Sequence, residues 1–140
     1  MRNSQMRRLV TISCLAMLPP LLSAAVATAQ RPTGNPEAAK VKNPVSASAE
    51  STAAGQKTFQ RYCRGCHGAD GKGGTEREGQ PAPPNLTDDV WEHGSTDGEI
   101  FKVIAKGIAP DLFMEPYEDR LSDEEIWNVV NYLRSIGPKK

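Results

Sequence analysis

Two cysteines and a histidine stand within five residues of one another, as Cys63-Arg64-Gly65-Cys66-His67. On a helical turn, residues three and four positions after Cys63 lie on the same face as Cys63. Both thiols and the imidazole therefore project from one side of the helix and can bind a single ligand. The fold must be arranged around whatever that face holds.

The chemistry of the three side chains points to a covalently attached haem. Two thiols at this spacing can form thioethers with the vinyl groups of a porphyrin, and the adjacent imidazole can reach the iron as its proximal ligand. The motif occurs once in the chain. We therefore predict one haem c, held covalently by Cys63 and Cys66, with His67 on the iron.

Three other interpretations of the motif compete with haem attachment. A structural zinc site needs four protein ligands, and only His93, or an Asp or Glu, is left to complete the set. A thioredoxin-like redox pair expects a preceding strand, whereas residues 53–62 have a helical pattern. A structural disulfide between Cys63 and Cys66 would leave the adjacent His67 unexplained. The haem interpretation accounts for all three residues together.

Residues 1–29 have the layout of a secretory signal peptide. A basic start precedes an apolar run of about 14 residues and the small residues Ala27-Thr28-Ala29. We expect cleavage near Ala29 and a periplasmic protein. The alternative is an uncleaved anchor, but Pro19-Pro20 interrupts the run, which is shorter than the roughly 20 residues that span a bilayer. No stable membrane insertion is expected after cleavage.

Cleavage would change two properties of the chain. Cys14 would be lost, so the only remaining thiols would be those of the motif. The balance of 17 basic and 17 acidic residues would become 14 against 17, a formal charge of −3. No basic stripe with interleaved aromatic residues remains, so nucleic acid is not an expected partner.

The mature chain divides into two parts of different composition. Residues 30–50 are rich in Pro, Ala and Ser and contain no Phe, Trp, Tyr, Leu or Ile. Such a segment buries too little apolar surface to offset its ordering entropy, so we predict a flexible linker. Residues 51–138 contain the motif and the apolar periodicity, and we predict a single domain there.

The last helix of this domain has the clearest sequence signals. Ser122 and Glu125 form a capping box at its start, and Gly137-Pro138 ends it. Between them one apolar stripe recurs at helical spacing. Its members are Ile126, Val129, Val130, Leu133 and Ile136.

Two further helices are predicted before it. Thr96 and Glu99 form a second capping box, and Gly107 is the expected end of that middle helix. An earlier helix is expected from about Thr52 to Cys66. A glycine inside an exposed helix costs roughly 1 kcal/mol of stability relative to Ala. Gly55 therefore suggests that another helix crosses closely at this point. The alternative is that Gly55 belongs to a frayed first turn.

The order of these features resembles a class I bacterial cytochrome c over about residues 50–138. The features that carry the resemblance are Gly55 and Phe59, the haem motif followed by Gly68, Pro84-Asn85-Leu86, Met114, and the helix start at Leu121–Glu125. The resemblance implies an all-α, class I cytochrome c fold of three to five helices with long loops wrapped around one covalently bound haem. The first and last helices would cross near Gly55.

The resemblance also implies two contacts to the haem site. The carbonyl of Pro84 would accept a hydrogen bond from the second ring nitrogen of His67, which fixes the ring and raises its basicity. Leu86 would lie against the porphyrin.

Met114 is the leading candidate for the sixth position on the iron. It would be the only methionine after signal cleavage, and its thioether raises the potential of a haem iron opposite a histidine. The alternatives are a gap-filling core methionine and ligation by His93 instead. Glu115 separates Met114 from Pro116, where the family often has proline directly, so the loop geometry can differ.

Two classes of function follow from the iron's coordination. With His67 and Met114 both bound, the chain would carry single electrons between larger redox proteins, namely a dehydrogenase, a quinol-oxidising complex or a terminal oxidase. We expect this carrier and not an enzyme, because no second set of titratable residues accompanies the motif. With Met114 unbound, the iron would take a gas or peroxide, as in a sensor or a catalyst.

Overall fold

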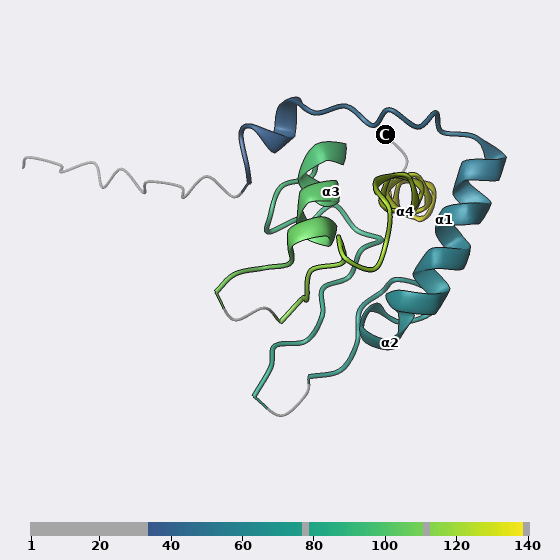
Figure 1. The fold of residues 1–140 in the computed structure, drawn as a ribbon. Helices are drawn as coiled ribbons and strands as arrows, with labels where there is room; N and C mark the ends of the chain where they lie inside the picture. The colour runs from purple at the N-terminus through teal and green to yellow at the C-terminus, as the bar shows by residue number, and fades with distance from the viewer. Residues whose placement is uncertain (1–33, 77–78, 111–112, 139–140) are drawn as a thin grey trace, which may run out of the picture.

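The computed structural model describes residues 34–76, 79–110 and 113–138. Over these ranges the chain is helical and forms no strand, as predicted (Figure 1). The signal peptide and its expected cleavage at Ala29 lie outside the described ranges. The elements in chain order are η1 (Ala38–Lys40), α1 (Ala49–Tyr62), α2 (Arg64–His67), α3 (Asp97–Lys106) and α4 (Asp123–Ile136).

The ends of α3 and α4 lie where their capping residues predict. Thr96 and Glu99 form a reciprocal capping box at the start of α3, and Ser122 and Glu125 form another at the start of α4. Gly107 is the C-cap of α3 and Gly137 is the C-cap of α4, as expected. Among the described helices, none has the length and apolar character needed to cross a bilayer.

α4 lies between α1 and α3, as Figure 1 shows with α4 viewed nearly end-on. Its predicted apolar stripe is the centre of the core, where Ile126 and Val130 are fully buried. Phe59 of α1, with 1% of its surface exposed, packs against Tyr132 of α4 with ring centroids 5.2 Å apart. Burial of this stripe against two helices therefore stabilises the arrangement.

The predicted close crossing of α1 and α4 occurs at Gly55. A β-carbon placed at Gly55 would stand 1.9 Å from the carbonyl oxygen of Asn128 and 3.0 Å from the β-carbon of Tyr132. No side chain fits into that space, so glycine is required there. The alternative of a frayed first turn is wrong, because α1 begins two turns earlier at a capping bond from Ser51 N to the Ser48 side chain.

The first helix is interrupted where a single helix was expected. α1 ends at Tyr62, and Cys63 is both its C-cap and the N-cap of the short helix α2. The prediction of one helix through Cys66 is therefore wrong at this point. Because of this break, Cys66 and His67 belong to α2, whereas Phe59 belongs to α1.

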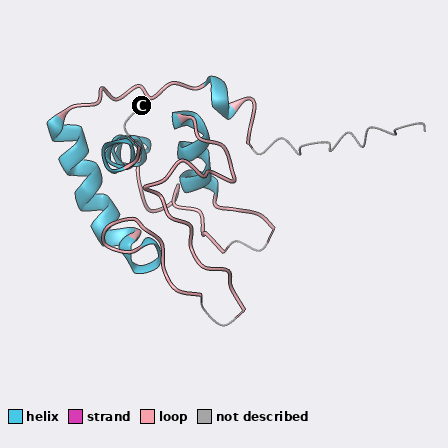
Figure 2. Cartoon of the chain, turned by 180° about the vertical axis from the view of Figure 1, so that it is seen from behind, coloured by secondary structure: helices cyan, strands magenta, loops and turns pink. Residues whose placement is uncertain are grey.

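The structure also differs from the prediction of a flexible linker before α1. Residues 35–48, which we call the N-terminal strap, run across one end of the helices in both views (Figures 1 and 2). Asn35 N donates to Glu99 Oε1 at 3.0 Å, and Asn43 Nδ2 donates to Asn131 Oδ1 at 2.9 Å. The linker prediction is therefore wrong for the strap, which polar contacts attach to α3 and α4.

The long loops gather on the side of the helices away from the strap (Figure 2). One loop joins α2 to α3, and the other joins α3 to α4. Together they enclose the space next to the motif. The site is therefore built from helices on one side and loops on the other.

Candidate cofactor site

A cavity of about 720 Å³ lies among α1, α4 and the two long loops. This volume is within the range of roughly 300–1,000 Å³ that holds small molecules and cofactors in proteins. All six predicted site residues line it, namely Cys63, Cys66, His67, Pro84, Leu86 and Met114. The structure thus brings them together, while their individual roles stay predictions.

The rest of the cavity wall is largely apolar. It comes from three helices, through Phe59 of α1, Ile100 and Ile104 of α3, and Val129 and Leu133 of α4. These residues were not predicted as part of a site. The sequence does carry a signal for these residues. Ile100 and Ile104 are four positions apart, as are Val129 and Leu133, so each pair lies on one face of its helix. Phe59 likewise stands four positions before Cys63.

The two cysteines of the motif are free thiols in the structure. Cys63 is half-buried and Cys66 is exposed. Burial, and secondarily the neighbouring Cys66, raises the pKa of the Cys63 thiol to about 11. Burial thus keeps the Cys63 side chain in its thiol form at neutral pH.

His67 is prepared for ligation by its surroundings. Burial lowers the pKa of its imidazole, and the nearby Pro84 carbonyl acts in the opposite direction but more weakly. The neutral ring is the form that binds a metal ion. Nδ1 of His67 is buried and makes no hydrogen bond within the described chain, although the Pro84 carbonyl is close enough to influence the pKa of the ring. An unpartnered buried ring nitrogen fits a histidine that would hold a haem iron through its other nitrogen.

A glycine-rich turn holds the proline segment against the motif. Gly73 N donates to His67 O at 2.9 Å, and Leu86 N donates to Gly71 O at 2.7 Å. Gly73 has a φ of 96°, and a β-carbon there would stand 2.6 Å from the carbonyl oxygen of Pro83. Glycine is therefore required where this turn passes close to the proline segment.

Met114 lies in the loop after α3 and is half-buried at the cavity. Ile108 N donates to its carbonyl at 3.0 Å, which fixes the loop. Glu115, which departs from the family pattern, is exposed and pairs with Arg120 at 2.8 Å. The extra residue is thus accommodated by a surface ion pair. His93, the alternative ligand, is exposed and also lines the cavity.

Tyr117 is a wall residue that sequence reasoning missed. Its hydroxyl donates to the carbonyl of Tyr62 at 3.3 Å, and its backbone N donates to Ile104 O at 3.1 Å. Burial, then the nearby Cys63, raises the pKa of its phenol. Tyr117 therefore ties the methionine loop to both α1 and α3. Its place directly after Pro116 was the only available sequence signal.

The side chains at the cavity suit a haem better than a bare metal ion. Within the ranges described, no three His, Cys, Asp or Glu side chains gather as a metal cluster. Two thiols, one imidazole, one thioether and apolar walls are what a covalent porphyrin requires. The residues present therefore fit haem c.

The helical fold and this cavity together define a class I cytochrome c. Two solved structures of cytochrome cL resemble the chain. The one from Methylophaga aminisulfidivorans MPT is 26% identical, with a TM-score of 0.54, and the match covers 64% of this chain and 55% of that one. The one from Hyphomicrobium denitrificans is 24% identical, with a TM-score of 0.56 and coverages of 69% and 53%; it shows the fold alone.

A family model places the chain more narrowly. Residues 50–133 match the model described as cytochrome C oxidase, cbb3-type, subunit III, and the chain belongs to this family. The subunit FixP of Bradyrhizobium diazoefficiens is 36% identical over 88 residues, covering 63% of this chain and 28% of FixP. The subunit CcoP of Azospirillum sp. is 41% identical over 98 residues, covering 62% and 31%. The chain thus matches less than a third of the length of these relatives. A cytochrome c of this family implies covalent haem c.

Proposed function

We propose that this chain is a periplasmic carrier of single electrons with one covalently attached haem c. The observation that carries the proposal is the meeting of two free thiols, a neutral imidazole and a methionine in one apolar cavity. The haem, when bound, supplies an iron that gains or loses one electron. The chain's own residues decide where that haem sits and at what potential it works.

Each residue group has a distinct part in the proposal. Cys63 and Cys66 hold the cofactor so that it does not exchange, and His67 and Met114 ligate the iron. The soft thioether of Met114 favours reduced iron and so raises the potential. The apolar walls exclude water, and such a shell also sets redox potential. With both ligands in place the iron has no open position, so we propose that the chain is not itself an enzyme.

The proposed partners are larger redox proteins. The relatives FixP and CcoP are named as subunits of cbb3-type cytochrome c oxidases. Of the three partner classes considered from the sequence, this favours a terminal oxidase over a dehydrogenase or a quinol-oxidising complex. The proposal rests on the matched domain alone, because the match covers less than a third of either relative.

Redox titration of the matured protein, with and without carbon monoxide, tests the proposal. We expect one reversible one-electron transition and no change in the reduced spectrum on adding carbon monoxide. Binding of carbon monoxide by the unaltered protein would show an open iron. The alternative, a gas sensor or a peroxide catalyst with Met114 unbound, would then replace the carrier.

A further inference from the structure

We propose that the mouth of the cavity is a docking surface for a redox partner whose own docking face is basic. The surface consists of Val90, Phe113, Asp89 and Glu92, and we call it the mouth surface. This inference rests on the proposed carrier function and adds the charge of its partner.

The first observation is the placement of exposed apolar side chains. In the described part of the chain, the large hydrophobic residues that are exposed are Val41 at 49%, Val90 at 67% and Phe113 at 46%. Two of these three, Val90 and Phe113, line the cavity. Single exposed hydrophobic residues are ordinary, but two that line one cavity place exposed apolar surface at the edge of that cavity, where a partner can cover it. Such residues form the water-excluding centre of an interface.

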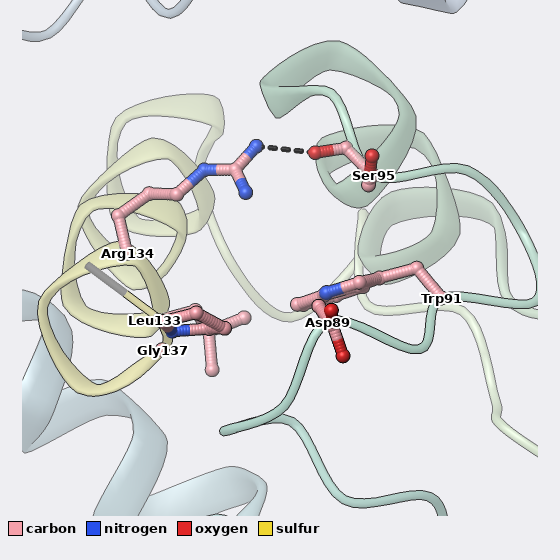
Figure 3. Close-up of a pocket in the computed structure, with 7 residues that line it drawn as sticks. Asp89, Trp91, Ser95, Leu133, Arg134 and Gly137 are labelled. Carbon is pink, nitrogen blue, oxygen red and sulfur yellow. Dashed lines mark hydrogen bonds between the residues drawn. The ribbon is translucent and has the colours of Figure 1, made fainter. Parts of the chain in front are cut away.

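The second observation is the charge beside Val90. Glu92 lines the cavity, and Asp89 lines a neighbouring hollow of about 90 Å³ (Figure 3). Trp91 lines both spaces, so the two carboxylates flank Val90-Trp91 along one stretch of surface. Both are exposed, and neither makes an ion pair with another described residue.

In the described part of the chain, no lysine or arginine forms an ion pair with Asp89 or Glu92. Arg134 is the cationic side chain drawn in Figure 3, and it points toward Ser95. It donates to the Ser95 carbonyl at 2.5 Å and to Asp97 at 2.7 Å, and is thereby committed to α3. Among the described residues that line the cavity there is no Lys or Arg. The mouth surface is therefore apolar at its centre and acidic at its edge.

A basic partner complements such a surface. Opposite charges steer two proteins together and raise the association rate, whereas like charges suppress it. Electron-transfer contacts are small and brief, so the association rate governs turnover. After signal cleavage the chain as a whole would carry a formal charge of −3, which likewise favours a basic partner.

Stopped-flow electron transfer from a lysine-rich cytochrome c of high isoelectric point tests the surface. The matured haem protein serves as acceptor, at a series of salt concentrations. We expect the second-order rate constant to fall as salt rises. We also expect Asp89→Lys with Glu92→Lys to lower it about tenfold at low salt. Val90→Ser should lower the rate constant at high salt as well.

Matched controls carry the same changes away from the cavity. Glu50→Lys with Glu124→Lys makes an equal charge change at two exposed residues that do not line it. Val41→Ser removes an exposed valine on the strap. Each control should change the rate constant less than twofold. Equal effects of the two pairs, or a rate constant that rises with salt, would overturn the proposed surface.

Hexacyanoferrate distinguishes the two proposals. If the haem protein does not cycle with this small oxidant and its reduced form, the carrier function itself fails. If it cycles normally while the two sets of variants behave alike, only the docking surface fails. The visible spectrum and potential of each variant should equal the parent's, which excludes a damaged fold.

Discussion

Gly55 lies directly against the backbone carbonyl of Asn128, so close that a β-carbon would stand 1.9 Å from the oxygen. This contact sets the distance between α1 and α4. Phe59 and Cys63 follow Gly55 at successive intervals of four residues, on the face that meets α4. Cys63, the first cysteine of the motif, thereby lines the same cavity as Val129 and Leu133 of α4.

Gly55→Ala should destabilise the protein by about 3 kcal/mol, because the obstructing atoms belong to backbone and the helices must separate. Urea unfolding of the matured protein measures this loss. Gly65→Ala is the control, since a β-carbon there meets no atom within 4 Å. It should change the free energy of unfolding by less than about 0.5 kcal/mol. Equal effects of the two substitutions would show that the crossing is not constrained at Gly55.

Met114→Ala should lower the reduction potential by on the order of 100 mV, because the soft ligand that favours reduced iron is lost. The same variant should bind carbon monoxide in its reduced form. Potentiometry and the visible spectrum measure both effects. His93→Ala removes the alternative ligand and should leave potential and gas binding as in the parent. A parent-like Met114→Ala would exclude Met114 as the ligand.

Glu99 should make stability depend on pH in the acid range. Burial alone would raise the pKa of its carboxyl, but hydrogen bonds from Thr96, Asn35 and Ser95 outweigh burial and lower the pKa below its usual 4.5. A lowered folded pKa contributes stability that is complete above pH 4.5 and is lost as the pH falls through the folded value. Urea unfolding between about pH 6 and pH 3 should show this decline.

Glu99→Gln should reduce that decline, since the amide does not titrate. Thr96→Val keeps the carboxylate and removes one of its donors, so it should reduce the decline in part. An unchanged pH dependence in Glu99→Gln would show that the contact with the strap and the helix cap does not depend on the ionised carboxylate.

Asn131→Ala should release the strap. Asn131 is 6% exposed and donates to Ser51 Oγ at 2.8 Å and to the Val45 carbonyl at 3.1 Å. Losing these bonds should cost about 2–3 kcal/mol, because buried polar groups are left unpaired. Trypsin should then cut at Lys40 and Lys42, which the peptide masses would reveal.

Asn43→Ala is the graded control for this network. It removes the strap's own donor to Asn131 but leaves the bond between Asn131 and Ser51 in place. We expect a loss of about 1 kcal/mol with partial cleavage. A cost as large as that of Asn131→Ala would mean that the buried bond to Ser51 contributes nothing.

The features that could be predicted are those determined by local chemistry. The capping boxes of Thr96 and Ser122 fixed the starts of α3 and α4, since the bonds span only three residues. Gly55 suggested a crossing because a glycine costs roughly 1 kcal/mol relative to Ala inside a helix, a cost that a close helix contact can justify. The motif predicted the site because three reactive side chains share one turn.

The features that could not be predicted depend on contacts between distant segments. The strap has no Phe, Trp, Tyr, Leu or Ile, and Asn35 and Asn43 attach it to residues more than sixty positions away. Composition predicts burial, but it does not report such bonds. The apolar walls at Ile100 and Val129 likewise could not be separated from ordinary core before α1, α3 and α4 were placed around one cavity.

The intact mass of the matured, acid-denatured protein tests the central claim most directly. Covalent attachment predicts a mass raised by that of one haem, and one proteolytic peptide that carries the haem on both Cys63 and Cys66. A zinc ion would be lost on denaturation, and a disulfide would instead lower the mass by two hydrogens. A chain matured in the periplasm with no added haem would contradict the account.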